Sequence, residues 1–160
     1  MKNITKQYQR WLCKFNTDFC GVGNMLVRYK YQMNSKCSSC GKEKKHTDHA
    51  ILCQEQGASL IWTNKMKKLE DWMTSQDFHP KIVQVIVTGL HSWRTNTPNT
   101  YLPLNIHLQQ AQTHQAQIGW FRFIEGFWTK EFQQCQQTFL TNSNIDKSST
   151  LLLSKAQRRI

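Results

Sequence analysis

The amino-acid sequence predicts an all-α protein, in which a helical domain accompanies a small knuckle-plus-helix module built on Cys and His residues. Apolar side chains recur at three- and four-residue spacing over most of the 160 residues, which is the period of an amphipathic helix. Three Cys and two His fall close together between residues 37 and 53. An apolar fraction of 39%, with six Trp and eight Phe, can form a buried core in a chain of this length.

Two helices are predicted in the basic N-terminal segment, residues 1–34. Apolar side chains between residues 4 and 18 recur at helical spacing, with basic side chains on the opposite side. The glycines on either side of Val22 break this helix. Asn24 is suited to cap a second helix that runs to Lys30.

The residues that organise the prediction follow the pattern Cys-x2-Cys, eight residues, His-x3-Cys, and they are Cys37, Cys40, His49 and Cys53. A Cys-x2-Cys turn directs two sulfurs at one point, and Gly41 gives the backbone freedom to leave that turn. Thr47 is suited to cap a helix on which His49 and Cys53, four residues apart, share one face. Three thiolates and one imidazole, in CCHC zinc-finger order, are typical of structural Zn²⁺. We therefore predict one closed zinc site in residues 35–58.

The sequence leaves alternatives to this site open. The cysteines can instead pack as small hydrophobic residues or form a disulfide, although their polar context favours a metal. His46 is a second candidate ligand, but only His49 has the helical relation to Cys53. A nuclease site at His46, Asp48 and His49 would need an open coordination position and a general base, and no catalytic residues are evident. We therefore expect a protein that is not an enzyme.

Residues 59–142 are assigned to a helical domain. Amphipathic spacing predicts helices at residues 60–74 and 81–93, and Pro80 is suited to the first turn of the second. The β-branched run within this second segment is also compatible with a buried strand, but its length and Trp93 favour a helix. After a loop, the Gln- and Ala-rich residues 104–117 favour a further helix.

The strongest periodic segment is residues 118–140, which we predict to form one helix. Its apolar stripe comprises Phe121, Ile124, Trp128, Phe132, Cys135 and Phe139. Further aromatic residues widen this stripe, so the helix is expected to pack on more than one side or to contact a protein partner between Phe121 and Phe139. The tail, residues 143–160, has no clear pattern beyond three leucines. Disorder and an incomplete element are both open for it.

The net charge of +11 is concentrated in the first half, where residues 1–50 carry ten Lys or Arg and three acidic residues. Such an excess favours a polyanion partner, RNA or DNA, although a solvated basic surface is an alternative. The candidate nucleic-acid-binding residues are Arg28, Lys30, Lys36, Lys42, Lys44 and Lys45. Tyr29 and Tyr31 alternate with the first two and can stack on bases, or the cations can simply extend along a helix surface.

No secretory signal and no apolar run of membrane length occur in the sequence. Six cysteines without such a signal favour a reducing compartment and metal binding over disulfides. We therefore expect an intracellular protein, cytoplasmic or nuclear, that does not contact membranes.

The order of motifs resembles the C-terminal zinc-binding region of non-LTR-like retroelement reverse-transcriptase polyproteins. The resemblance runs over roughly residues 5–140 and is carried by Trp11-x3-Phe15-x3-Phe19-Cys-Gly-Val-Gly, Ser35-Lys-Cys37-x2-Cys40-Gly, His49-x3-Cys53, the helix from Ile82 to Trp93, and Ile118-Gly-Trp120-x2-Phe123-x2-Gly126. It implies a zinc-stabilised accessory domain that helps hold RNA or DNA for copying or integration, with the metal at the four Cys and His positions above. The paired aspartates of a polymerase and the acidic set of an RNase H do not occur in this sequence.

Two functions from different classes follow from these observations. The first is a zinc-stabilised nucleic-acid-binding accessory domain, which is motivated by the metal motif inside the basic half. The second is a non-catalytic structural or protein-interaction domain, in which zinc only holds helices together. The two differ in whether partner binding depends on salt and on the basic residues.

Overall fold

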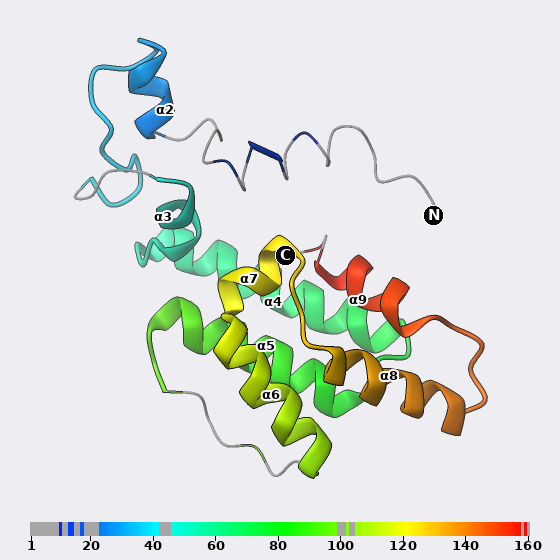
Figure 1. Ribbon diagram of the computed structural model, residues 1–160. Helices are drawn as coiled ribbons and strands as arrows, with labels where there is room; N and C mark the ends of the chain where they lie inside the picture. Colours follow the sequence, from blue (N-terminus) through cyan, green and yellow to red (C-terminus); the bar gives the residue numbers. More distant parts are fainter. Residues whose placement is uncertain are drawn as a thin grey trace. The chain divides into compact units, whose positions relative to one another are not determined.

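The computed structural model describes residues 10, 13–14, 17, 23–41, 46–98, 102, 105–157 and 159. The chain divides into two compact units, residues 1–62 and 63–160, and the boundary falls inside helix α4. Within the described ranges the regular structure is helical and no strand is present, so the predicted all-α class is confirmed (Figure 1). None of the described helices has the length and apolar character that a membrane span requires.

From α3 onward most helices follow one another with short connections, whereas a long segment separates α2 from α3. In order they are α2 (Gly23–Arg28), α3 (Thr47–Leu52), α4 (Gln56–Ser75), α5 (Pro80–Thr95), α6 (Ile106–Ile118), α7 (Trp120–Glu125), α8 (Lys130–Asn142) and α9 (Ser149–Gln157). The helix predicted at residues 4–18 falls largely outside the described residues.

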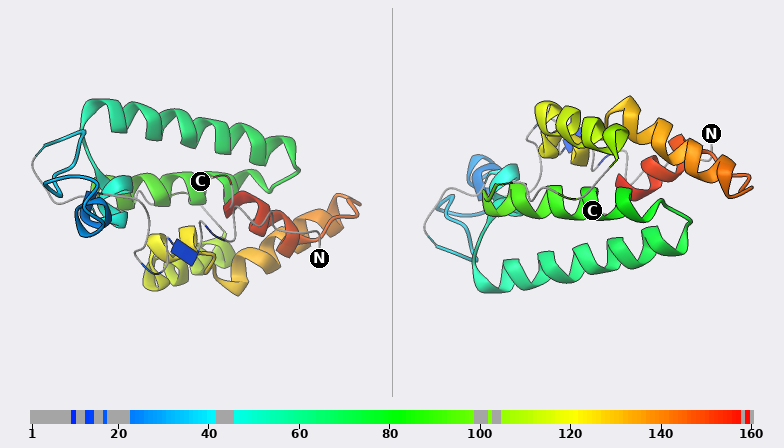
Figure 2. Two further views of the ribbon diagram at one scale, coloured as in Figure 1. Left: turned by 90° about the horizontal axis from the view of Figure 1, so that it is seen from above. Right: turned by 90° about the horizontal axis from the view of Figure 1, so that it is seen from below.

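Helix α5 is the centre of the second unit. Figure 2 shows it between the part of α4 that belongs to this unit and the group formed by α6, α7, α8 and α9. Burial on both sides leaves Ile82, Val85 and Ile86 with no exposed surface. The β-branched run is therefore a buried helix rather than a strand, because packing on both faces outweighs its modest helix propensity.

The start of α5 is fixed by local chemistry. Pro80 occupies the first turn, as predicted, where its missing N–H is not needed. His79 is the N-cap, and its Nδ1 accepts a hydrogen bond of 3.0 Å from the backbone N–H of Lys81. The backbone N–H of His79 donates in turn to the side-chain oxygen of Gln136, at 2.9 Å.

The prediction of one helix over residues 118–140 is wrong, because α7 and α8 are separate helices. Gly126 ends α7 with a φ of 106°, a left-handed conformation that suits glycine. Thr129 then caps α8, and its hydroxyl accepts from the N–H of Phe132. The apolar stripe is thus divided between two helices, so no continuous helical surface runs from Phe121 to Phe139.

The tail contains a helix that its sequence pattern did not predict. Leu152, Leu153 and Ala156 of α9 are buried, and the helix packs against α7 and α8. Lys147, just before α9, forms an ion pair with Asp77 at 2.6 Å. Residues 149–157 therefore belong to the folded second unit rather than to a disordered extension.

Two buried glutamines form hydrogen bonds with the backbone of the loops that connect helices of the second unit. Gln115 donates to the carbonyls of Gly119 and Phe127 and accepts from the N–H of Thr129. Gln136 donates to the carbonyl of Asp77, in addition to accepting from His79. Neither side chain has exposed surface, so each replaces water for backbone groups that have left solvent.

We expect Gln136→Leu to destabilise the second unit by about 2–6 kcal/mol. The leucine keeps the volume, but it leaves the His79 N–H and the Asp77 carbonyl without their partner, at about 1–3 kcal/mol for each unsatisfied group. Urea unfolding followed by circular dichroism measures the change. Gln137→Leu, at an exposed position of the same helix whose side chain accepts a 3.4 Å bond from Ser149, is the milder control. Equal unfolding midpoints for the two variants would contradict this account.

His79 makes the second unit less stable in acid. Burial lowers the pKa of His79, and the nearby charge of Lys81 lowers it further. The unfolded chain therefore takes up the proton at a higher pH than the native chain does. The stability that neutral His79 contributes is present above the unfolded pKa of about 6.5, and it is lost as the pH falls below it. We expect the urea midpoint to drop less between pH 7.5 and pH 5 in His79→Asn, which keeps an N-cap but does not titrate.

Candidate metal centre

The first half of the site is the tight turn from Cys37 to Gly41. The backbone N–H of Gly41 donates to the carbonyl of Cys37 at 2.7 Å, which closes the turn. Gly41 has a φ of 67°, in the left-handed region where a side chain is strained. The turn thus has the knuckle conformation that the Cys-x2-Cys-Gly pattern predicts, and it directs two sulfurs to the same side.

The second half of the site is the short helix α3. His46 is its N-cap residue and makes no side-chain capping bond. Thr47, which the sequence predicts as the cap, is instead the first residue of the helix. Cys53 is the C-cap, and its N–H donates to the carbonyl of His49 at 2.9 Å. One turn of helix therefore separates the two residues, and their side chains project to the same side.

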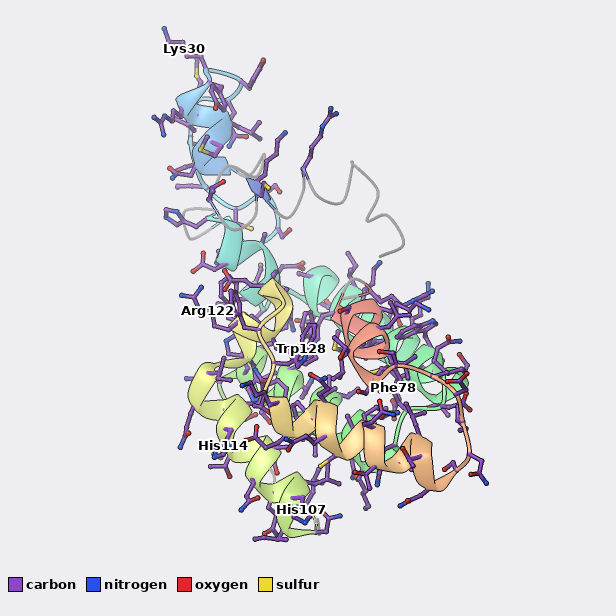
Figure 3. All side chains as sticks on the ribbon, turned by 45° about the vertical axis from the view of Figure 1, so that its right-hand side comes forward. Lys30, Phe78, His107, His114, Arg122 and Trp128 are labelled. Carbon is purple, nitrogen blue, oxygen red and sulfur yellow. The ribbon has the colours of Figure 1, made fainter. Side chains whose placement is uncertain are left out.

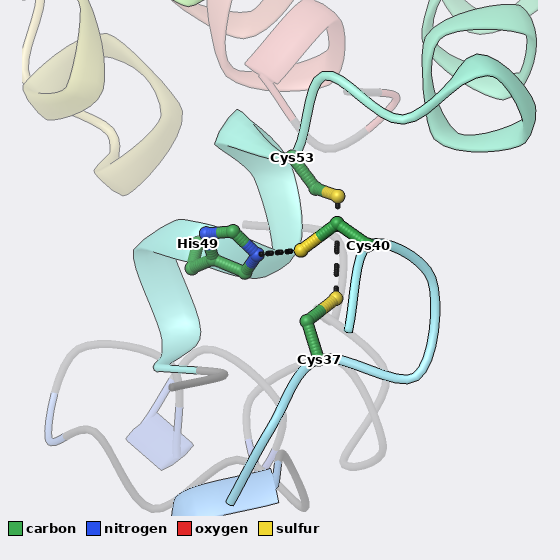
Figure 4. Close-up of side chains that lie close together, drawn as sticks. All are labelled: Cys37, Cys40, His49 and Cys53. Atoms are coloured by element: carbon green, nitrogen blue, oxygen red, sulfur yellow. Dashed lines mark hydrogen bonds between the residues drawn. The ribbon is translucent and has the colours of Figure 1, made fainter. Parts of the chain in front are cut away.

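The four predicted ligands converge on one point (Figure 4). The ligand atoms of Cys37, Cys40, His49 and Cys53 all lie within 4.8 Å of one another. The Cys37 and Cys53 sulfurs are 4.0 Å apart, and the Cys40 sulfur lies 3.4 Å from Nε2 of His49. A tetrahedral zinc site with standard bond lengths requires about 3.8 Å between two sulfurs and about 3.5 Å between sulfur and nitrogen. The cluster is close enough to bind one metal ion and has nearly the size that zinc requires.

The alternatives to a metal fit this geometry less well. The 4.0 Å separation of the Cys37 and Cys53 sulfurs is about twice the length of a disulfide bond. Hydrophobic packing of the cysteines would also not explain why the ring nitrogen of His49 lies 3.4 Å from the Cys40 sulfur. His46, the other candidate ligand, is not a member of the cluster.

The electrostatics of the site favour thiolate at Cys37. Burial would raise the pKa of this thiol, but the backbone N–H groups of Cys40 and Ser39, with the side chains of His49 and Cys40, lower it to about 6. Burial also acts to lower the pKa of His49, yet the two neighbouring sulfurs raise it. The thiolate, which is the form that binds a metal, is thus favoured at Cys37. At Cys53 a backbone hydrogen bond from Glu55 acts to lower the pKa of the thiol, but burial and the neighbouring Cys37 raise it.

The described basic candidates lie on the surface of the same unit. Arg28, Lys30 and Lys36 are exposed. Tyr29 and Tyr31 are 55% and 79% exposed, and Met33 is fully exposed. Lys42, Lys44 and Lys45 lie outside the described residues. The sequence pattern did not single out Met33.

His107 and His114 of α6 are not members of the Cys and His cluster. His107 and His114 project from α6 (Figure 3). Nδ1 of His114 lies 2.9 Å from a carboxylate oxygen of Glu131, in a partly exposed contact. Across the residues that the structure describes, the cluster of three Cys and one His is the one group of this kind.

Comparison of the chain with protein-family models, with curated proteins and with solved structures gave no match.

Proposed function

We propose that this protein is a zinc-stabilised nucleic-acid-binding accessory module without catalytic activity of its own. The observation that carries the proposal is the position of the Cys and His cluster. It lies on the same stretch of chain as an exposed segment of cations and aromatic side chains. Residues 23–41 contain Arg28, Lys30 and Lys36 and no acidic residue. The metal would hold the end of this segment in place for an anionic partner.

Zinc is the metal that best suits the donor set. Three sulfurs and one imidazole nitrogen are soft to borderline ligands, which select zinc over magnesium or calcium. Four protein ligands would complete a tetrahedral shell and leave no position for a substrate or an activated water. The ion would therefore stabilise the fold of the module rather than take part in a reaction.

The exposed tyrosines favour a single-stranded partner. Tyr29 and Tyr31 present their rings to solvent between cations, and stacking on a ring requires a base with a free face. Paired bases inside a duplex do not offer one. This chemistry agrees with the accessory role that the resemblance to retroelement reverse-transcriptase tails implies, in which the module holds RNA or DNA in an intracellular compartment.

The salt dependence of binding tests the electrostatic part of this proposal. We expect the full chain, loaded with zinc, to bind labelled single-stranded RNA or DNA with an affinity that falls steeply with salt. The slope of log K against log salt should be about 0.7 per phosphate contacted. Lys30→Glu with Lys36→Glu should weaken binding by about tenfold or more and make that slope shallower. Fluorescence anisotropy at several salt concentrations measures both quantities.

The matched control is Lys67→Glu with Lys68→Glu, which makes the same charge change at exposed positions of α4. Tyr29→Ala with Tyr31→Ala should weaken binding by about 1–3 kcal/mol per stacked base while leaving the salt slope unchanged. Binding that does not respond to salt, or that weakens equally in both pairs of lysine variants, would favour the structural or protein-interaction function instead.

A further inference from the structure

A pocket of about 480 Å³ lies between α6 and α8, beside the start of α5. Its lining residues all belong to the second unit, and none of them is part of the metal cluster. Sites for small organic ligands in proteins have volumes of about 300–1,000 Å³. The pocket is therefore large enough for a ligand of one or two rings.

The lining is almost without net charge. No lysine or arginine of the described chain lines the pocket, and Glu131 is its one carboxylate. That carboxylate already has a hydrogen-bonding neighbour, because it lies 2.9 Å from Nδ1 of His114. A phosphate would find no cation here, and an ammonium group would have to compete with His114. The pocket thus favours an uncharged ligand.

The polar lining consists mainly of uncommitted amides. The side chains of Gln110, Gln134 and Asn142 line the pocket, and none of the three has a hydrogen-bond partner among the described residues. Each amide presents a donor and an acceptor side by side in one plane. Such pairs match the adjacent donors and acceptors on the edge of a nucleobase, as in the bidentate contact of Asn or Gln with adenine.

Two rings complete the pocket wall. The rings of His79 and Phe139 are 4.9 Å apart between centroids and inclined at 52°. His79 is held rigidly, because its backbone N–H is bound by Gln136 and its Nδ1 by the N–H of Lys81. In the neutral ring Nε2 then carries the proton.

We propose that this pocket binds a nucleobase, as an uncharged planar heterocycle that packs on Phe139 and forms hydrogen bonds with the amides of Gln110, Gln134 and Asn142. The binding does not require the basic segment of the first unit or a phosphate on the ligand. A failure of nucleobase binding would therefore not count against nucleic-acid binding by the metal module, and the reverse also holds.

Titration of the whole 160-residue chain, loaded with zinc, with adenosine, guanosine, cytidine and uridine tests the proposal. We expect at least one nucleoside to bind saturably, with a dissociation constant on the order of 0.1 mM for a ligand of this size. Amide shifts in two-dimensional NMR spectra should concentrate in α6, α8 and the start of α5. The matching nucleoside monophosphate should bind no more tightly, because the pocket lacks a cation.

Two pocket variants and one control make the test specific. Gln134→Ala, at an exposed lining position, should weaken binding by about threefold to tenfold. Thr138→Trp should abolish binding by filling the pocket. Gln117→Ala removes an exposed amide of α6 outside the pocket and should have no effect. The proposal is overturned by any of three results: no shift with any nucleoside, equal binding of glucose at the same residues, or equal effects of Gln134→Ala and Gln117→Ala.

Discussion

Removing the metal is expected to unfold the described part of the first unit, residues 23–41 and 46–62, while the second unit keeps its structure. Among its described residues the first unit has few buried apolar side chains, and two of them, Cys37 and Cys53, belong to the cluster itself. In small zinc modules the metal contributes about 10–16 kcal/mol, which exceeds what such a core supplies. The second unit has its own core around α5 and needs no ion. Two-dimensional NMR before and after chelation distinguishes the two sets of amides.

Metal analysis completes this experiment. Purified protein should contain one zinc ion per chain, and Cys40→Ser should lose it and show the spectrum of the chelated protein. Cys135→Ser is the control, because this half-buried cysteine of α8 lies outside the cluster. Metal-free protein whose first unit still gives dispersed amide signals would show that the four side chains converge without an ion. The zinc proposal would then fail.

The metal cluster could be predicted from the sequence because each half of it is local. Cys37 and Cys40 are joined by a turn that Gly41 closes, and one helical turn relates His49 to Cys53. Only the approach of the turn to the helix depends on the fold of the chain. The presence of four residues of metal-binding type already indicates that the two approach each other. The helical class was equally accessible, since apolar periodicity and Pro80 report directly on local structure.

The features that the sequence did not reveal depend on distant partners. Helical spacing continues from Phe121 to Phe139 although Gly126 separates two helices, because each helix buries its own part of the stripe. Gln136 reads as an ordinary polar helix residue, yet its partners lie 57 and 59 residues away. The pocket between α6 and α8 likewise exists only once the two helices are placed side by side. Backbone partners and cavities leave no periodic signal in a sequence.

Gly89→Ala is expected to destabilise the second unit by about 3 kcal/mol, although alanine is the better helix former. In an exposed helix this change would gain about 1 kcal/mol. Here a Cβ at Gly89 would lie 2.0 Å from Cζ2 and 2.2 Å from Cε2 of the Trp120 ring. Trp120 is itself 4% exposed and cannot move into solvent without opening the core. Overpacking of this kind typically costs about 1–3 kcal/mol, and occasionally more. Urea unfolding of the two proteins measures the difference.

A double-mutant cycle shows whether the contact with Trp120 is the cause. Trp120→Phe removes the part of the ring that the new Cβ would meet, together with an indole N–H that has no hydrogen-bond partner among the described residues. In that background Gly89→Ala should be neutral or stabilising. The new methyl group would then enter the space that the smaller ring leaves, and the higher helix propensity of alanine would no longer be offset by a clash. Gly57→Ala, at an exposed glycine in the first turn of α4 whose nearest obstacle is the flexible Glu55 side chain, should not destabilise the protein. If Gly89→Ala costs the same in both backgrounds, α5 and α7 do not approach each other through this glycine, and the close packing at the centre of the second unit must be reassigned.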